Sequence, residues 1–434
     1  MNRFSLAVSG AIARVTEAAL GPYQTAVIRI GFAATWLLFL LREFPHRHEL
    51  YGPDGPWSWD LGRRLIDLNH AFTVLMWSDG GLWFEAVYLL AALFAALLML
   101  GWRTRAMSVL FLVGVLSLQN RSVLMGDGGD NVLHLMSVYL VFTRCGQVWS
   151  LDARRARRTA AAHARGERVA DRAGPVLWGL SGLVLVASTL AGKLGEDWML
   201  KVTESGGASA PEQVWTFLVS AVNGPGMVPA LLWSAWAAQG LWWLVAHRAG
   251  SAQPRIMLDV VANILHNAAL LVIMAEACLI YATAGWYKIQ GSRWQDGTAA
   301  YYPLHLDYFS PWPALGDLLS ANGTLVMLVT YGTVLVQVVF PFTLLNRRLK
   351  NVLLAVMITE HAVIAVVLGL PFFSLAMIAA DAVFLPTTFL RRLGALAARA
   401  RGRLLRRTGR SGPPDRPAGE PLPEHPAPAG VTRT

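Results

Sequence analysis

The residues best suited to carry chemistry lie between positions 284 and 299. The stretch Ala284-Gly285-Trp286-Tyr287-Lys288 is followed by Trp294-Gln295-Asp296-Gly297-Thr298-Ala299, which places one amine and one carboxylate just beyond a long apolar helix. A lysine crowded by aromatic side chains at a membrane boundary is poorly hydrated, and this disfavours its charged form. The neutral amine of Lys288 can then act as a base. Two alternatives stay open: Lys288 is an anchor that reaches water, and Asp296 only fixes the turn at Gly297.

Other polar residues fall inside or beside apolar runs. A polar side chain inside a span is expensive in lipid, so it either serves function or joins two helices. Arg29, within the first run, is expected to pair with a carboxylate or to extend toward the membrane surface. The turn Gly126–Asn131 lets the backbone approach a ligand or a neighbouring helix, and Asp130 or Asn131 could cap the next helix. The remaining candidates are Asn120, Glu276, Glu360, His361 and Asp381.

Several kinds of site are not indicated by the sequence. The carboxylates and histidines show no metal-ligand spacing, so no metal is predicted. Cys145 and Cys278, the two cysteines, do not suggest a disulfide framework. No Ser-His-Asp pattern, phosphate-binding glycine loop or dinucleotide fingerprint occurs.

The composition belongs to a lipid environment. Of the 434 residues, 55% are hydrophobic and 15% are charged, against roughly 25% charged residues in globular chains. The net charge of +10 comes from basic residues in short connecting segments and in the tail. That pattern directs membrane topology, so we expect a lipid bilayer as partner and no nucleic acid.

Apolar runs long enough to approach a bilayer crossing predict an all-α, polytopic bundle of about ten (eight to ten) transmembrane helices. The third and fourth runs are short and should extend into flanks such as Gln119 and Asn131. The last two form a tight hairpin at Pro371. The ten runs are Thr25–Leu41, Phe84–Leu100, Met107–Leu118, Val132–Phe142, Val176–Leu190, Val228–Val245, Ile264–Ala284, Leu325–Leu345, Val352–Leu370 and Phe372–Phe389.

The distribution of Lys and Arg predicts the orientation. With a cytoplasmic N-terminus, 27 of these residues lie inside and 9 outside. Cytoplasmic segments carry the excess of positive charge, so both termini are expected in the cytoplasm and Lys288 on the extracytoplasmic side of the cell membrane.

Three segments are predicted along the chain. Residues 1–24 form a cytoplasmic N-terminal segment, which we interpret as mature sequence because it lacks a convincing cleavage site. Residues 25–390 form the bundle, within which Asp152–Arg172 is expected to be a basic surface helix near anionic headgroups. Residues 391–434 form a basic tail, Pro-rich and disordered from about Arg399 onward.

The chain resembles the membrane-embedded part of vitamin K-dependent γ-carboxylase and the wider bacterial group of HTTM (horizontally transferred transmembrane) proteins. The resemblance covers roughly Thr25 to Leu385. It is carried by the Ala-Gly-x-x-Lys helix end, then Trp294 and the Asp296-Gly297-Thr298-Ala299 segment. Supporting matches are Asn120, the Gly-Gly-Asp at 128–130, Trp149-Ser150-Leu151-Asp152, Glu360-His361 and Phe372-Phe373.

The resemblance implies a role for each matching residue. Lys288 matches the base that deprotonates vitamin K hydroquinone, so a reduced quinone is the implied cofactor. Asn120 and His361 match polar positions loosely and join Lys288 as catalytic candidates. The implied pocket comprises Trp286, Trp294, Asp296, Asp130 and Glu360.

The chain also departs from the eukaryotic carboxylase. That enzyme carries a large lumenal domain after its spans, whereas a basic tail follows here. The pair of runs within 176–245 resembles an insertion relative to shorter bacterial members. Some bacterial relatives are linked to maturation of secreted peptides, so a small peptide is an expected partner. Three functions stay open: a lysine-base enzyme acting on a quinol-type or other lipid-soluble substrate, a non-catalytic protein for peptide maturation or assembly, and a transporter.

Overall fold

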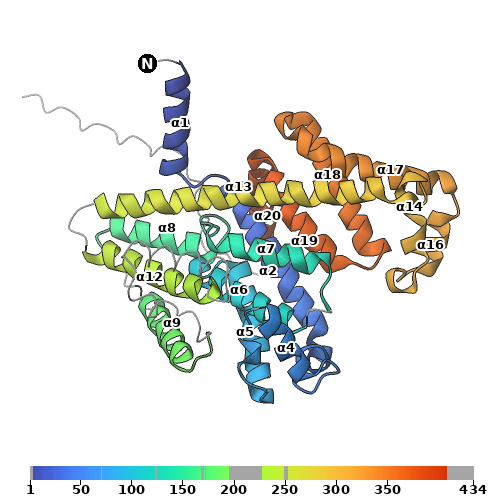
Figure 1. The fold of residues 1–434 in the computed structure, drawn as a ribbon. Coiled ribbons are helices and arrows are strands. Elements are labelled where there is room, and N and C mark those ends of the chain that lie inside the picture. The colour runs from blue at the N-terminus through green and yellow to red at the C-terminus, as the bar shows by residue number, and fades with distance from the viewer. Residues whose placement is uncertain are drawn as a thin grey trace, which may run out of the picture. The chain divides into compact units, whose positions relative to one another are not determined.

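The computed structural model describes residues 3–69, 71–122, 125–167, 171, 173–194, 227–248 and 253–407 (Figure 1). Within these ranges the chain is helical and contains no β-strand. The loop expected at Ala191–Met227 lies mostly outside the described residues, as does the tail from position 408. Contact density divides the chain into two compact units, Met1–Thr387 and Thr388–Thr434.

The first unit begins with α1 (Arg3–Glu17), α2 (Pro22–Glu43), η1 (Phe44–His46), α3 (Arg47–Tyr51), α4 (Trp59–Asn69), η2 (Leu75–Trp77), α5 (Gly81–Leu100), α6 (Thr104–Arg121), α7 (Gly128–Val141), α8 (Leu151–Ala164) and α9 (Ala173–Leu190). It continues with α12 (Met227–Arg248), α13 (Gln253–Gln290), α14 (Ser292–Gln295), α15 (Tyr301–Leu304), η4 (Asp307–Phe309), α16 (Pro313–Ser320), α17 (Gly323–Val339), η5 (Phe340–Leu345), α18 (Arg347–Val367), α19 (Pro371–Asp381) and η6 (Ala382–Phe384). Helix α20 (Thr387–Arg407) follows at the unit boundary.

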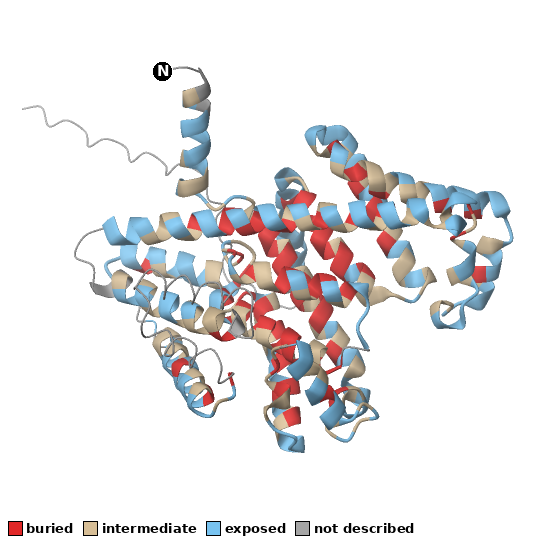
Figure 2. Cartoon of the chain, in the orientation of Figure 1, coloured by how far each residue is buried: buried red, intermediate tan, exposed pale blue. Residues whose placement is uncertain are grey.

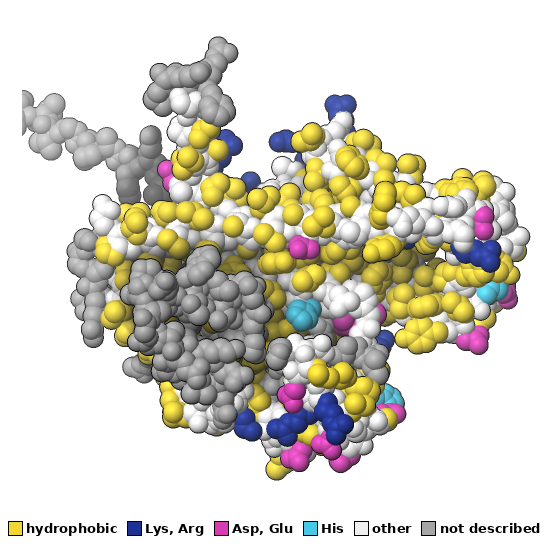
Figure 3. Space-filling model, in the orientation of Figure 1, with side chains coloured by type: hydrophobic (Ala, Val, Ile, Leu, Met, Phe, Trp, Pro, Cys, Tyr) yellow, Lys and Arg dark blue, Asp and Glu magenta, His cyan; other side chains and the backbone are white. Residues whose placement is uncertain are grey.

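Every predicted apolar run falls on helical structure. The short third and fourth runs extend as expected, since α6 includes Gln119 and α7 includes Asn131. Among the described residues, six helical segments are long and apolar enough to cross a membrane, or seven if Pro371–Phe384 and Thr387–Arg403 count as one broken span. The six are Pro22–Tyr51, Gly81–Leu100, Ala173–Leu190, Gln253–Gln290, Gly323–Leu345 and Arg347–Val367. This identifies a multi-pass helical membrane protein. Hydrophobic side chains cover much of the described surface in Figure 3, as lipid contact requires.

The tenth run does not form one continuous helix. Helix α19 ends at Asp381, a short 3₁₀ segment follows, and Leu385 is extended with ψ of 136°. The physical reason is Pro386, because the residue before a proline is driven out of the helical region. Helix α20 then runs to Arg407, so Arg399–Arg407 is helical rather than disordered. Its Ala, Leu and Arg residues are strong helix formers.

Small residues set the close helix contacts of the bundle. A Cβ on Gly31 of α2 would lie 2.6 Å from the Cβ of Ala379 on α19, and one on Gly114 of α6 would lie 3.0 Å from that of Ala91 on α5. Such contacts let the helix backbones approach closely. Close approach strengthens van der Waals packing, which stabilises helix association in lipid, where the hydrophobic effect does not drive it. The buried residues in Figure 2 accordingly gather on α2, α5, α6, α19 and the middle of α13, while outward faces are exposed.

Arg29 ties three segments together. Its fully buried guanidinium donates to the carbonyls of Leu98 and Met99 at the end of α5, and to those of Cys145 and Trp149 in the α7–α8 connection. The expectation that Arg29 pairs with a carboxylate or extends toward the surface is therefore wrong. A planar fork of donors suits four converging carbonyls, and a cation is favoured at a helix C-terminus.

Helices α9 and α12 form a reciprocal pair. The indoles of Trp178 and Trp236 stack with centroids 4.4 Å apart, and each donates to the backbone carbonyl of the other at 2.9 Å. Four residues after each tryptophan is a glycine, Gly182 or Gly240, whose missing side chain leaves room for the opposite indole. This Trp-x-x-x-Gly repeat joins the two predicted inserted helices, and α12 contacts α13 of the bundle.

Candidate functional site

Lys288 lies in the last turn of α13, not beyond its end as the sequence suggested. The helix is 38 residues long, about 57 Å at 1.5 Å per residue, and so exceeds the hydrocarbon core of a bilayer. The Lys288 side chain is half-buried. Its Nζ donates to Oε1 of Gln337 at 2.8 Å and lies 5.2 Å from the ring centroid of Trp294.

The glycine of the Ala-Gly-x-x-Lys motif has a packing role beside this contact. Gly285 is buried against α17, where a Cβ would lie 2.6 Å from Cγ2 of Val338. Lys288 follows three residues later on the same face of α13, and Gln337 precedes Val338 on α17. The close approach at Gly285 therefore brings the Lys288 amine within reach of Gln337.

The carboxylate of Glu360 is linked to Lys288 through one intervening side chain, that of Gln337. The Gln337 Nε2 donates to Oε1 of Glu360 on α18 at 3.1 Å, and Thr333 presents its hydroxyl to the same carboxylate. Thr333 and Gln337 are one turn apart on α17, so they present their polar groups to the same neighbour. The result is a run of hydrogen bonds from Lys288 through Gln337 to Glu360.

A second buried group begins at the residue after Glu360. The hydroxyl of Tyr281 on α13 lies 3.1 Å from Nε2 of His361 and 3.0 Å from Oδ2 of Asp381, and all three side chains are at most 3% exposed. The single Tyr281 proton can serve one of these neighbours at a time. His361 Nδ1 and Asp381 Oδ1 have no hydrogen-bond partner among the residues that the structure describes. The structure thus contains two polar chains, that is, two series of hydrogen-bonded side chains, drawn from α13, α17, α18 and α19. One ends at Glu360 and the other at His361, which are adjacent in sequence.

The segment after α13 folds back on α17. Gly297 has φ of +77°, and Tyr331 donates to the carbonyl of Gln295 at 2.8 Å. The Asp296 carboxylate accepts from the hydroxyl and backbone N–H of Thr298, and these bonds hold the pKa of Asp296 below its usual range. The structure thus gives Asp296 the turn-fixing contacts of the alternative interpretation.

The aromatic residues near Lys288 differ in exposure. Trp294 is partly buried beneath the amine, whereas Trp286 and Tyr287 are 62% and 74% exposed. They offer aromatic surface beside the end of α13.

Three further candidates make contacts elsewhere. Asn120 donates to the carbonyl of Phe72 at 2.7 Å. Glu276 meets the hydroxyl of Tyr139 at 3.3 Å. Asp130 belongs to a capping box in which Asp127, not Asp130 or Asn131, is the N-cap of α7.

The glycines of that turn serve helix packing. The turn uses no positive φ at Gly128 or Gly129. Instead, a Cβ on Gly129 would lie 2.6 Å from Cα of Phe373 on α19. The approach to a neighbouring helix is confirmed for this turn.

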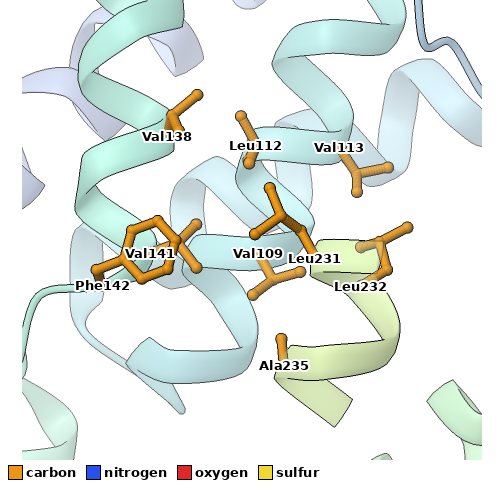
Figure 4. Close-up of a pocket in the computed structure, with 9 residues that line it drawn as sticks. All are labelled: Val109, Leu112, Val113, Val138, Val141, Phe142, Leu231, Leu232 and Ala235. Carbon is orange, nitrogen blue, oxygen red and sulfur yellow. The ribbon is translucent and has the colours of Figure 1, made fainter. Parts of the chain in front are cut away.

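An apolar hollow of about 350 Å³, including space open to the outside, lies between α6, α7 and α12. Its lining contains only Val, Leu, Ala and Phe side chains, from Val109, Leu112, Val113, Val138, Val141, Phe142, Leu231, Leu232 and Ala235 (Figure 4). None of the candidate residues lines it. Within the described ranges, no group of three His, Cys, Asp or Glu side chains could hold a metal ion.

Two central residues were missed from the sequence. Gln337 is a lone amide in the run Leu325–Leu345, and a polar residue in a span is itself a signal. Tyr281 lies two turns before Lys288 on α13, a spacing that places both on one face. No protein-family model, curated protein or solved structure gives a significant match to this chain.

Proposed function

We propose that this multi-pass protein is an HTTM-type membrane enzyme in which the Lys288 amine acts as a base toward a reduced quinone. The observation that carries the proposal is the contact of a half-buried amine with the neutral amide of Gln337, without any ion pair to Lys288 in the described part of the chain. A carboxylate in direct contact would hold the lysine in its charged form, whereas an amide leaves both forms accessible. The Ala-Gly-x-x-Lys resemblance supplies the reaction class.

The residues around Lys288 fit an aromatic, weakly acidic ligand. Trp286 and Tyr287 expose aromatic faces near the end of α13, and Lys288 provides a proton acceptor over the ring of Trp294. Aromatic rings favour offset or edge contacts with other aromatic rings. When bound, a reduced quinone supplies a phenolic O–H as the proton donor.

Residues of this chain then accept the proton and stabilise the resulting charge. The nitrogen lone pair of Lys288 forms an N–H bond as the phenolic O–H bond breaks, and the electron pair stays on the oxygen. The resulting ammonium keeps its bond to Gln337 Oε1 and the electrostatic attraction of the Trp294 face. Glu360, one amide away, offsets the new positive charge.

The proposed topology has about ten crossings of the cell membrane, both termini in the cytoplasm and Lys288 on the extracytoplasmic side. The excess of Lys and Arg in the predicted inner segments supports it. A membrane-impermeant amine reagent applied to intact cells should modify Lys288 and spare Lys350. Modification of Lys350 without modification of Lys288 would show that the opposite orientation holds.

A peptide partner remains part of the proposal. The resemblance to proteins linked to peptide maturation supports it. In this version, a peptide docks beside the extracytoplasmic end of α13, either as the co-substrate of the quinol reaction or as cargo of a non-catalytic assembly protein.

Proton or ion transport is the second candidate function. The observation that favours it is the pair of polar chains that meet at Glu360 and His361 inside the bundle. Ionisable residues inside spans often mark ion or proton routes. Proteoliposomes separate the functions: oxidation of quinol by dissolved dioxygen without charge movement supports the enzyme, and movement of protons without quinol supports transport.

The direct test of the enzyme uses purified protein in lipid with reduced menaquinone-type quinol and dissolved dioxygen as the oxidant, with and without peptide. Wild-type protein and Lys193→Ala, a lysine whose Nζ donates to the Trp77 carbonyl, should turn over quinol equally. Lys288→Ala should lose turnover while reaching the same level in the membrane. Equal turnover by Lys288→Ala would end the proposal.

A further inference from the structure

Gln337 stands out because an amide inside an apolar helix is costly unless its groups are bonded. It is 5% exposed within α17, and both ends of its side chain are bonded, to Lys288 and to Glu360. An amide group without a hydrogen-bond partner is strongly disfavoured in an apolar environment. The residue therefore satisfies its own groups by joining a base candidate to a carboxylate.

The two neighbours fix which way the Gln337 amide points. An amide oxygen only accepts and an amide nitrogen only donates. A Glu360 carboxylate can only accept, so it takes the Nε2 end at 3.1 Å and turns Oε1 toward Lys288 at 2.8 Å. Thr333, one turn before Gln337 on α17, presents its hydroxyl to the same carboxylate. The orientation of Gln337 is thus dictated from the Glu360 side.

This orientation has a consequence for the amine. A neutral lysine amine has two N–H groups and one lone pair in tetrahedral directions. If one N–H is held by Gln337 Oε1, the lone pair must point away from Gln337. A free amine would rotate among three directions, and general-base catalysis depends on the geometry of the acceptor.

We propose that Gln337 is the positioning residue for Lys288 and that Glu360, through Gln337, keeps the lysine lone pair directed away from Gln337. The inference rests on the proposed function, because a positioned lone pair matters only if Lys288 is a base. Replacement of Gln337 by Glu would put the carboxylate directly on the amine and hold it as ammonium. Replacement by Met keeps the shape and removes the acceptor.

The test measures amine reactivity and needs no substrate. Full-length protein in lipid vesicles is treated with a small acylating reagent across a pH series, and mass spectrometry compares modification of Lys288 with that of Lys193 in the same molecule. Variants are Gln337→Glu, Gln337→Met, Glu360→Gln and the double variant Gln337→Met/Glu360→Gln. Gln290→Glu is the matched control, since it adds the same charge near Lys288 at an exposed position.

Gln337→Glu should slow acylation of Lys288 at neutral pH by about tenfold. The reason is that a charge-assisted bond to a carboxylate stabilises the ammonium form more than a neutral bond to an amide does. Gln290→Glu should change it less than about threefold, because exposed charges are screened. Glu360→Gln should alter the pH profile of Lys288 more strongly when Gln337 is present than in the Gln337→Met background, where only the through-space attraction between Glu360 and the amine is lost.

Two results would overturn the inference. One is a Lys288 pH profile that is the same in Gln337→Glu and wild type while both proteins remain folded. The other is an equal effect of Glu360→Gln with and without Gln337, which would show that Glu360 acts independently. If the labelling results hold but no quinol is turned over, the proposed function fails and the positioning of Lys288 stands.

Discussion

Gly285 on α13 faces Val338 on α17 so closely that a Cβ at Gly285 would lie 2.6 Å from Cγ2 of Val338. This contact sits beside the bond between Lys288 and Gln337. The glycine of the motif is therefore explained by helix approach rather than by a ligand.

Gly285→Ala should push α13 and α17 apart, because the stiff β-branched Val338 cannot yield easily. Overpacking of this kind costs about 1–3 kcal/mol. The midpoint of denaturant unfolding in one detergent measures it. Gly332→Ala on α17 is the control, since nothing lies within 4 Å of its Cβ position and alanine favours helices. Equal stability of both variants would contradict the packing role, and Gly285→Ala/Val338→Ala should recover part of the loss.

Arg29→Met should destabilise the bundle by at least about 3 kcal/mol, because it leaves buried carbonyls of α5 and of the α7–α8 connection without donors. Arg29→Lys should rescue little, since a point charge cannot reach four acceptors. Arg42→Met provides a comparison at the exposed end of the same helix, where the guanidinium lies over Phe372. An Arg29→Met protein as stable as Arg42→Met would show that the four contacts contribute nothing.

Tyr281→Phe should cost about 1–3 kcal/mol of unfolding free energy, because among the described residues Oδ1 of Asp381 already lacks a partner and Oδ2 would lose the bond from Tyr281. Removing both partners is less harmful than removing one. Tyr281→Phe/Asp381→Leu should therefore be more stable than Tyr281→Phe alone. Simple addition of two destabilising effects would contradict the pairing.

Gly182→Ala and Gly240→Ala should weaken the α9–α12 pair to a similar degree. Their Cβ atoms would lie 2.7 Å from Trp236 Nε1 and 2.8 Å from Trp178 Cζ2, respectively. Gly179→Ala, on the same helix with nothing within 4 Å, should be harmless. Thermal unfolding of the three variants in the same lipid gives the comparison. A loss of stability in only one of the two glycine variants would argue against the reciprocal arrangement.

Much of the fold could be predicted from the sequence because lipid restricts the choice. Apolar runs must be helical, and each predicted run falls on helical segments, with a break in the tenth. The break at Leu385-Pro386 was also readable in principle, since Pro386 stands within the tenth run. The Trp-x-x-x-Gly pairs at 178–182 and 236–240 were visible as letters, but only the packing reveals their reciprocity.

The site was less accessible to sequence reasoning. Lys288, Glu360 and His361 were singled out, yet their links depend on Gln337 and Tyr281, which join residues from 23 to 100 positions apart. Arg29 was expected to find a carboxylate and instead binds backbone carbonyls. Backbone acceptors leave no mark in the side-chain sequence, so such partners cannot be predicted from residue types.

The measurement that bears most directly on Lys288 is quinol turnover by Lys288→Met, whose side chain keeps similar length without a proton acceptor. Turnover should be lost in lipid vesicles while the unfolding midpoint stays near that of wild type and while Lys350→Met keeps full activity. Undiminished turnover by a folded Lys288→Met protein would contradict the assignment of this amine as the base.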